Sequence, residues 1–509
     1  MEGTPMAYTY KVMGKEVTLD VDPAVVAVRF DPLIPRSMRA QATEDAGAGP
    51  FSSRFEIPGE ALTIVPVGYV TSDPDKATKT ITRLNVQPEV EQTLPVFRVG
   101  GNRVVAADRV IVGIKDPVDI PAIEAKYALS LVEARDNSAV YQIPAKTDVF
   151  ELCATLDHDS MVRFAEPDFI TIGKHIPSKS SSTTPSVALP QAAEKQYAMN
   201  ITQARAAWEV QLGLLSITIA ILDEGVDTKH KDLAGAISKT FDGTDNDPYQ
   251  EPNSWDGHGT ACAGLAGGAG KESDNGVLGS GTGCSIMPIR IAYSGHEGGP
   301  WVTSNSIISR SIKWAWENGA DVLSNSWGGG APSNEIAEHF ENARTKGRGG
   351  LGCVIVVAAG NSNGPVQFPG TVPNILTVSA SNEFDQLKTP TSADGENWWG
   401  TCFGPEISVA APGVHNRTTD IGGVAGYTDG DYSPNFNGTS SATPIVAGAC
   451  GLVLSCNRNF QEEQVREIII RSADKVGAYE YVDGRNDYFG YGRLNVLNAV
   501  NIASGAATA

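Results

Sequence analysis

Residues Asp256–Gly264 read D-G-H-G-T-A-C-A-G. Small residues flank His258 on both sides, so a neighbouring segment can come close to its imidazole. The run continues as an Ala- and Gly-rich stretch, which predicts a helix that begins at the histidine. A histidine in such a place is often a hydrogen-bonded core residue without a chemical role, so its meaning depends on what the rest of the chain brings beside it.

Two other segments supply the partners that a reactive histidine needs. Upstream, the apolar run Ile217–Leu222 predicts a buried strand that ends at Asp223. Downstream, Asn437–Pro444 reads N-G-T-S-S-A-T-P and predicts a second small-residue helix with Ser440 near its start. Either residue alone fits a helix cap equally well. Together they add a carboxylate and a hydroxyl to the imidazole, which are the three groups that serine acyl transfer requires.

The C-terminal two-thirds of the chain predicts one three-layer α/β domain with a mostly parallel sheet. Short apolar runs rich in β-branched residues alternate with helical stretches, as in parallel strands that are buried on both faces and joined by right-handed crossovers. Functional groups gather at the carboxyl ends of such strands. The strands are expected at Ile217–Leu222, Ile286–Ile291, Val322–Asn325, Val354–Ala358 and Ile375–Ser379, and the helices include Asn305–Asn318, Glu335–Lys346 and Gln461–Ser472.

Three short motifs resemble those of the subtilisin-like serine peptidases: Asp223–Gly225, His258–Thr260 and Gly438–Ser440. Their order along the chain, Asp then His then Ser, is the subtilisin order and differs from the orders in the chymotrypsin and α/β-hydrolase families. The resemblance covers about residues 196–503. It implies a subtilisin-like fold for that part of the chain.

The resemblance also implies an activity. It predicts a serine endopeptidase that hydrolyses peptide bonds in proteins through an acyl-enzyme at Ser440, with His258 as the base and Asp223 as the group that orients it. No cofactor is required for this chemistry. The chain departs from the family pattern at Glu224 and Ser441, and neither position supplies a triad atom.

Residues outside the triad receive roles from the same resemblance. Asn361 ends the string V-V-A-A-G-N (356–361) and is expected to donate to the oxyanion together with the backbone N–H of Ser440. A turn former is the alternative role for this asparagine. The substrate backbone is expected to lie beside two strand ends and above a pocket floor. The substrate-binding candidates are Ser326, Trp327, Gly328, Ala358, Ala359, Gly360 and Gln367.

Calcium is common in the subtilisin-like family, and three residues of the chain stand near one family site. They are Asp232, Asp274 and Asn275. Hard oxygen ligands of this kind suit calcium. Ordinary solvated side chains are the alternative interpretation, because the loop that follows His258 is longer than the common pattern.

The N-terminal third predicts a separate inhibitory segment. Residues 108–174 parse as strand, helix, strand, strand, helix, strand, which indicates a ferredoxin-like α+β fold. Residues 175–195 are rich in Ser, Thr and Pro and read as a linker. With residues 196–509 as the peptidase, this order resembles a zymogen whose propeptide assists folding, inhibits the enzyme and is cut in the linker. A permanent accessory domain is the alternative.

Residues 1–107 are predicted to be strand-rich, without a readable topology or role. The runs that indicate strands there are Val25–Phe30, Leu62–Tyr69 and Thr80–Leu84.

Composition excludes several classes of partner. The chain carries 39 Lys plus Arg against 59 Asp plus Glu, a net charge of −20, which opposes binding to nucleic acid or an anionic membrane. No run approaches the roughly 20 apolar residues of a membrane span. The expected partners are therefore a protein or peptide substrate and the intramolecular propeptide.

The seven cysteines are an odd number without a C-x-x-C pair, so buried reduced thiols are expected rather than a disulfide framework or a zinc site. The first twenty residues lack a basic start followed by an apolar run. A cytoplasmic location is expected, with export by another route left open.

Two other classes of function fit the sequence less well. A nucleotide-binding protein is indicated by G-G-A-G-K at 267–271, but a phosphate loop needs Ser or Thr after the lysine and the chain has Glu272. A peptide-binding scaffold descended from a protease would be expected to lack a triad residue or the oxyanion asparagine, and this chain has all four.

Overall fold

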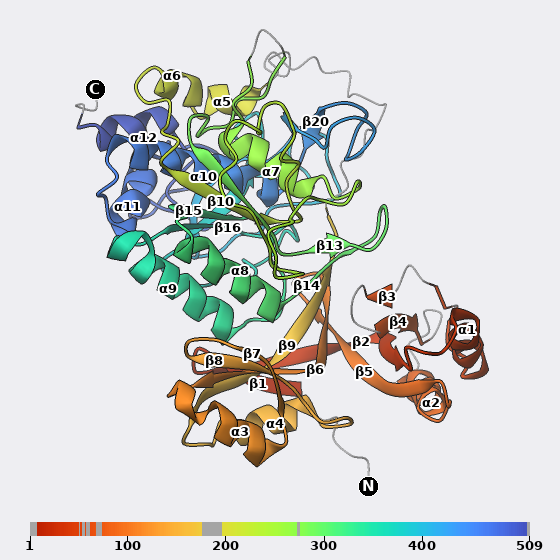
Figure 1. Ribbon diagram of the computed structural model, residues 1–509. Coiled ribbons are helices and arrows are strands. Elements are labelled where there is room, and N and C mark those ends of the chain that lie inside the picture. Colours follow the sequence, from red (N-terminus) through yellow and green to blue (C-terminus); the bar gives the residue numbers. More distant parts are fainter. Residues whose placement is uncertain are drawn as a thin grey trace. The chain divides into compact units, whose positions relative to one another are not determined.

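The structure is a computed structural model of the 509-residue chain and describes residues 8–49, 51–52, 56–57, 62–67, 74–175, 196–271 and 275–505. The chain forms two compact units (Figure 1). Unit 1 contains Met1–Lys174, Ser294–Ser306 and Gly330–Glu335, and unit 2 contains His175–Tyr293, Ile307–Gly329 and Ile336–Ala509. The predicted linker lies outside the described residues except for His175.

Unit 2 is built on a seven-stranded sheet with the order β11-β12-β10-β15-β16-β17-β18, and each neighbouring pair is parallel. Nearly every strand residue is buried, as the apolar runs in the sequence predict. The strands are β10 (Thr218–Asp223), β11 (Phe241–Asp242), β12 (Ser285–Arg290), β15 (Val322–Asn325), β16 (Val354–Ala358), β17 (Leu376–Ser381) and β18 (Ile407–Pro412).

Helices cover both faces of this sheet (Figure 1). On one side lie α7 (His258–Gly267) and α10 (Thr439–Cys456), which are buried along almost their whole lengths. On the other side run α8 (Asn305–Glu317) and α9 (Asn334–Gly350). The three-layer α/β architecture predicted from the sequence is therefore confirmed for unit 2.

The predicted elements of unit 2 agree closely with the structure. The five predicted strands are present, and their ends differ by one or two residues at most. In α9, Gly347, Arg348 and Gly349 have non-helical backbone angles, so the regular helix ends near the predicted Lys346. Helix α10 is long and apolar enough to cross a membrane, but 94% of it is buried inside the unit. It is the central helix of a core.

The main sheet of unit 1 has the strand order β13-β14-β9-β6-β5-β2-β4-β3, where β13 is Tyr293–Ser294, and its ladders from β14 to β3 are antiparallel. A hairpin strand, β1, pairs with β2, and β8 and β7 extend the sheet beside the second half of β6. The strands are β1 (Tyr8–Val12), β2 (Lys15–Phe30), β3 (Glu56–Ile57), β4 (Leu62–Pro66), β5 (Val90–Val99), β6 (Asn102–Ile114), β7 (Ser130–Ala134), β8 (Ser138–Gln142), β9 (Val162–Gly173) and β14 (Trp301–Ser304).

The part of unit 1 predicted to be ferredoxin-like has the expected element order. From β6 onward it runs through α3 (Ile120–Tyr127), β7, β8, α4 (Val149–Leu156) and β9. The predicted boundary between residues 107 and 108, however, falls inside β6. This strand is continuous because its first half pairs with β5 and its second half pairs with β8, so the segments before and after the boundary share one sheet.

One predicted strand is wrong. Thr80–Leu84 belongs to the helix α2 (Pro74–Leu84). Its threonines favour a strand locally, but Ile81 and Leu84 are three residues apart and both join one hydrophobic cluster with Phe30, which is the spacing of a helix face. Tertiary packing overrides the local propensity here. The predicted run Leu62–Tyr69 is a strand only as far as Pro66, and residues 68 and 69 lie outside the described part.

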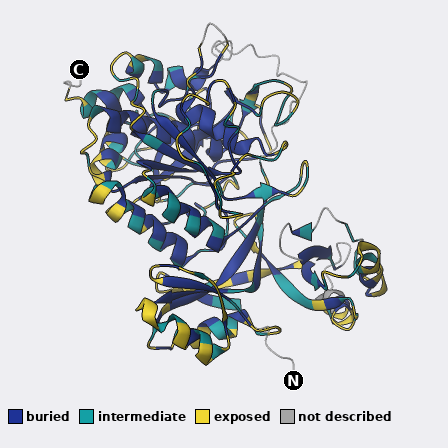
Figure 2. Ribbon diagram, in the orientation of Figure 1, coloured by how far each residue is buried: buried dark blue, intermediate teal, exposed yellow. Residues whose placement is uncertain are grey.

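Burial follows the two units (Figure 2). The largest cluster lies in unit 2 between the parallel sheet and α10, and it includes Ile219, Val356 and Ile445. In unit 1, a second cluster joins residues of the N-terminal hairpin, such as Tyr10, to Phe169 on β9. Residues 8–107 and 108–174 therefore share a hydrophobic core as well as a sheet.

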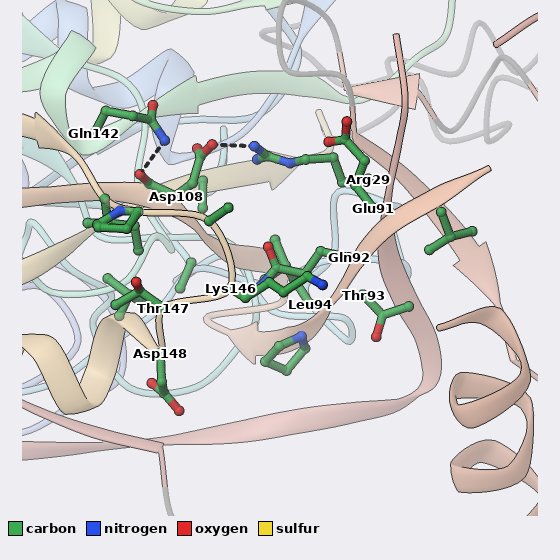
Figure 3. Close-up of a pocket in the computed structure, with 18 of the residues that line it drawn as sticks. Arg29, Glu91, Gln92, Thr93, Leu94, Asp108, Gln142, Lys146, Thr147 and Asp148 are labelled. Atoms are coloured by element: carbon green, nitrogen blue, oxygen red, sulfur yellow. Dashed lines mark hydrogen bonds and ion pairs between the residues drawn. The ribbon is translucent and has the colours of Figure 1, made fainter. Parts of the chain in front are cut away.

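A cavity of about 760 Å³ opens within unit 1 (Figure 3). Its walls are β5, the middle of β6 and the loop after β8. Arg29 forms an ion pair with Asp108 at one side, and Gln142 Nε2 donates to the Asp108 carbonyl oxygen (2.8 Å). None of the residues predicted for catalysis lines this cavity, and all four of them belong to unit 2.

Candidate active site

Asp223 and His258 form a buried pair at the carboxyl edge of the parallel sheet. Asp223 is the last residue of β10, and His258 is the first residue of α7. Asp223 Oδ1 accepts hydrogen bonds from His258 Nδ1 (2.8 Å) and from the backbone N–H of Glu224 (2.8 Å). A carboxylate held in this way fixes the imidazole with its proton on Nδ1, which leaves Nε2 free to take a proton from a nucleophile.

The glycine that follows the histidine has a steric reason. A Cβ atom on Gly259 would lie 2.1 Å from the Gly225 carbonyl oxygen and 3.1 Å from Asp223 Cβ. Helix α7 can therefore approach the end of β10 only if this position has no side chain. The H-G-T motif is thus a packing requirement for bringing His258 to Asp223.

Ser440 lies in the first turn of α10, two residues after Gly438. The φ of Gly438 is 111°, a positive value that glycine adopts more readily than other residues. We call residues 438–440 the nucleophile turn. Ser440 Oγ donates to the Ser326 carbonyl oxygen (3.0 Å), and Ser326 Oγ donates to the Ser440 carbonyl oxygen (3.0 Å). This pair of bonds ties the nucleophile turn to the end of β15. In this rotamer the hydroxyl must turn away from Ser326 before it donates to His258.

Cys262 joins the serine and the histidine, and sequence analysis did not single it out. Its Sγ lies 3.8 Å from His258 Nδ1 and 3.5 Å from the Ser440 carbonyl oxygen. The structure therefore brings Asp223, His258 and Ser440 to one place. The spacing in the helix carries the signal, since Cys262 is one turn after His258. Burial, reinforced by Asp223, raises the pKa of the thiol well above its usual value, so Cys262 stays a neutral thiol.

Asn361 follows β16 and faces the same turn. Its Oδ1 accepts from the backbone N–H of Thr439 (2.8 Å) and from Thr439 Oγ1 (3.0 Å). With the oxygen held in this way, the amide NH₂ group is left to donate to another oxygen. The backbone N–H of Ser440 belongs to the first helical turn, where amides have no acceptor within the helix. Two donors are thus available beside the nucleophile.

The predicted substrate-binding segments lie next to one another. The backbone N–H of Gly329, just after Ser326, Trp327 and Gly328, donates to the Phe368 carbonyl oxygen (2.8 Å). Gln367 N–H donates to the Ala359 carbonyl oxygen (3.0 Å), and a Cβ on Gly360 would lie 2.6 Å from Gln367 Oε1. The structure therefore places Gln367 over Gly360, between the segments that carry Ser326 and Ala358.

His175 also lies at this site, and it is not among the site residues predicted from the sequence. Its ring stacks on that of His258, with centroids 4.8 Å apart and an interplanar angle of 25°. Its Nε2 lies 3.0 Å from the carboxylate of Glu224, a buried side chain next to Asp223. Burial lowers the pKa of His175, but Glu224, Asp223 and Asp256 outweigh that effect and leave the pKa above its usual value. The strand end that carries His175 gave no motif to identify it.

The candidate calcium residues are only partly within the described chain. Asp232 is buried, and its Oδ2 accepts from the Val277 N–H (2.8 Å) and from Tyr432 OH (2.9 Å). The Asn275 carbonyl oxygen accepts from Arg417 Nη2 (2.6 Å). Asp274 lies outside the described residues. Carboxylate and carbonyl oxygens are the ligands that calcium prefers, so the donor chemistry fits, although Oδ2 of Asp232 already has two donors.

A family model described as the Subtilase family matches residues 216–492. The match spans more than half of the chain and contains Asp223, His258, Asn361 and Ser440. The chain belongs to the subtilase family. This membership confirms the resemblance to subtilisin-like serine peptidases that the three motifs indicate.

Known relatives of this subtilase agree with the assignment. It is 36% identical over 335 residues to a "Calcium-dependent protease" from Nostoc sp.. This match covers 58% of this chain and 48% of that protein. The chain thus spans about half the length of that relative. It is 31% identical to "Thermitase" from Thermoactinomyces vulgaris, over 61% of this chain and 98% of thermitase.

A solved structure supports the fold. The crystal structure of fervidolysin from Fervidobacterium pennivorans, described as a keratinolytic enzyme related to subtilisin, matches with a TM-score of 0.59 at 22% identity. The match covers 77% of this subtilase and 61% of fervidolysin. At this identity the comparison concerns the fold alone.

Proposed function

We propose that this subtilase is a serine endopeptidase in which His258 removes the Ser440 proton while Asp223 orients the ring. The observation that carries the proposal is the 2.8 Å bond between Asp223 Oδ1 and His258 Nδ1, beside the helix that begins with the nucleophile turn. Ser440 attacks the peptide carbonyl, the leaving amine takes the proton from His258, and water then hydrolyses the acyl-enzyme. Asn361 Nδ2 and the Ser440 N–H stabilise the oxyanion.

A fluorophosphonate probe tests this reaction directly. The full chain and Ser440→Ala are incubated with the probe and measured by intact mass. We expect one adduct per chain in the first protein and none in the second, together with hydrolysis of a protein substrate only by the first. A wild-type chain that folds but neither reacts with the probe nor cleaves protein would favour the scaffold alternative.

We infer further that residues 108–174 act as a propeptide that inhibits the peptidase. The stacking of His175 on His258 supports this inference, because a ring in that position covers the catalytic imidazole. Cleavage is then expected in the linker between His175 and Gln196. Intact mass of the two proteins above would show self-cleavage in the wild type and an uncut Ser440→Ala chain.

Two buried carboxylates on β9 support the same inference. Glu166 accepts from the Asn334 N–H (2.6 Å), and Asp168 accepts from the Ser306 N–H (2.9 Å) and Ser306 Oγ (2.6 Å), all within unit 1. Asn334 begins α9 and Ser306 is the second residue of α8, so each carboxylate satisfies free amides at a helix start, where negative charge is favourable. Within unit 1, β9 thus binds two residues that come from the peptidase segment of the sequence, Ser306 and Asn334.

We propose that the substrate is an extended protein or peptide segment. It would pair with the backbone of Ser326–Gly328 and Ala358–Gly360, with a side chain directed toward Gln367. The position of Gln367 Oε1, 2.6 Å from where a Cβ on Gly360 would lie, supports a polar or mixed preference at that pocket. Main-chain pairing gives affinity with limited sequence choice, and a peptide library read by mass spectrometry would measure the preference.

Structural calcium is a further proposal. The Nostoc relative is named a calcium-dependent protease, and Asp232 and Asn275 would hold an ion near α7. Calcium would contribute to stability and not to the chemistry.

We also propose a cytoplasmic location. The seven cysteines of the chain are free thiols, which is compatible with a reducing compartment, and fractionation of the native host would test it.

A further inference from the structure

A polar cluster behind the nucleophile turn has no role in the reaction described so far. His415 lies between two buried carboxylates, with Nδ1 3.1 Å from Glu383 Oε1 and Nε2 3.4 Å from Glu396 Oε1. Glu383 and Glu396 are 4% and 3% exposed. Two buried carboxylates that face one imidazole need a positive charge between them, because an unpaired buried charge is costly.

The cluster is bonded to the turn that carries Ser440. Glu396 Oε1 accepts from Asn437 Nδ2 (2.8 Å), and the backbone N–H of His415 donates to Asn437 Oδ1 (2.7 Å). Both ends of the Asn437 side chain are therefore held by the cluster. One residue further, the Gly438 N–H donates to the Gly413 carbonyl oxygen (2.8 Å). The segment around His415 thus fixes the two residues that precede Thr439 and Ser440.

Glu396 is itself held from behind. Its Oε2 accepts from Trp399 Nε1 (2.6 Å), and its backbone oxygen accepts from Lys388 Nζ, which also pairs with Asp394 (2.9 Å). Lys388 is fully buried. The Glu396 carboxylate is therefore held by Trp399 and Asn437 as well as by its contact with His415.

Other titratable groups lie around His415. Burial and the charge of Glu383 raise the pKa of Tyr197, whose hydroxyl donates to the Val414 carbonyl oxygen. Lys388 is paired with Asp394 behind Glu396. Burial lowers the pKa of His415, but the hydrogen bonds that its ring donates to Glu383 and Glu396 outweigh it and raise the pKa to about 9. The imidazolium is thus retained at neutral pH and lost as the pH rises through about 9.

We propose that His415, as an imidazolium, is a positioning residue that clamps Glu396 and Asn437 and so holds the Ser440 turn in its reactive geometry. This inference rests on the proposed peptidase function. It assigns the two limbs of the pH profile to different histidines. Protonation of His258 lowers activity at acid pH, and deprotonation of His415 loosens the nucleophile turn at alkaline pH.

The test compares His415→Gln and His415→Lys with the wild type, using kcat per active site titrated with a burst substrate, so that unfolded protein does not count. In His415→Gln we expect kcat at pH 7.5 to fall about tenfold, the size of a lost hydrogen bond to a charged group, with KM within about twofold of the wild type because no substrate contact is changed. The alkaline limb near pH 9 should vanish. His415→Lys should recover most of kcat and move that limb upward, because a lysine titrates near pH 10.4.

His296→Gln, a change at a histidine of unit 1 whose Nδ1 lies 3.0 Å from the Glu297 carbonyl oxygen, serves as the matched control and should leave the profile unchanged. An active wild type whose kcat profile is the same in His415→Gln would overturn the clamp while leaving the peptidase intact. An inactive wild type would instead refute the proposed function. A general loss of stability in His415→Gln would lower the titrated fraction and not kcat per site, so that outcome also counts against the clamp.

Discussion

The ring of His175 stacks on the ring of His258 at 4.8 Å, with its Nε2 bonded to Glu224. The first residue of the predicted linker thus covers the imidazole that, in the proposed mechanism, accepts the Ser440 proton. The acidic neighbours of His175 favour its charged form. We call the contacts of His175 with Glu224 and His258 the latch, and we expect their strength to depend on pH.

The first prediction concerns this latch. Glu224→Gln keeps the shape of the side chain and removes its charge, so we expect the precursor to show between about threefold and tenfold more activity before processing than the wild type at pH 6.5. The raised pKa of His175 means that the latch is fully present below its ordinary pKa of about 6.5 and is lost as the pH rises through the raised value. The difference between the two proteins should therefore shrink at alkaline pH.

The measurement is initial hydrolysis of a fluorogenic peptide, divided by the rate of the processed enzyme at the same pH. Glu251→Gln, an exposed carboxylate in the same unit, is the control. Equal ratios for Glu224→Gln and the wild type at every pH would show that the latch does not limit activity.

The second prediction concerns the orienting carboxylate. Asp223→Asn preserves the packing at the end of β10 but presents an amide to His258 Nδ1, which favours the wrong tautomer. A loss of about 10⁴-fold in kcat is expected, as for the equivalent change in another serine peptidase. Stopped-flow acylation kinetics would measure it, and an effect below about tenfold would mean that Asp223 is not the orienting group.

The third prediction concerns the oxyanion donor. In subtilisin, removal of such a donor reduces kcat by about 10²- to 10³-fold, and we expect the same order for Asn361→Ala. KM should change little, because the bond forms mainly in the transition state. Asn361 also accepts from Thr439, so Asn361→Asp is a useful companion, since it keeps that acceptor and loses the donor. Recovery of activity in Asn361→Asp would refute the oxyanion role.

The fourth prediction concerns calcium. A chelator should lower the Tm of the processed enzyme, and calcium but not magnesium should restore it, because calcium tolerates irregular oxygen sites. By mass action, a free calcium concentration about 100 times the Kd of the site adds about 2.7 kcal/mol to the free energy of unfolding. Asp232→Asn should abolish the response to calcium. If the chelator leaves the Tm of the wild type unchanged, the proposal of a calcium site is wrong.

The sequence predicts unit 2 well for a physical reason. Parallel strands buried on both faces are apolar throughout, so Val322–Asn325 and Val354–Ala358 can be located without knowing their neighbours. Small residues around His258 and Ser440 are required by close packing, as the space around Gly259 shows. Each of these requirements acts within one short segment, so it can be recognised from the sequence of that segment alone.

The rest depends on contacts between distant residues. Thr80–Leu84 has strand propensity and becomes helical because Leu84 packs with Phe30. His175 has no motif, since its role comes from Glu224 and His258, which lie far along the chain. The His415 cluster likewise joins three loops. No single segment contains enough of such an arrangement to identify it.

Strand β14 comes from the peptidase segment of the sequence, yet it forms a backbone ladder with β9 from Trp301↔Gly173 to Ser304↔Ile170. Hydrolysis of a bond in residues 176–195 would therefore yield two polypeptides that still share a sheet. Severing the chain and freeing the N-terminal piece are separate events, and the second requires the ladder to come apart. If the linker is cut as we propose, the expected product is a nicked species that migrates as one particle under native conditions and as two chains in denaturant.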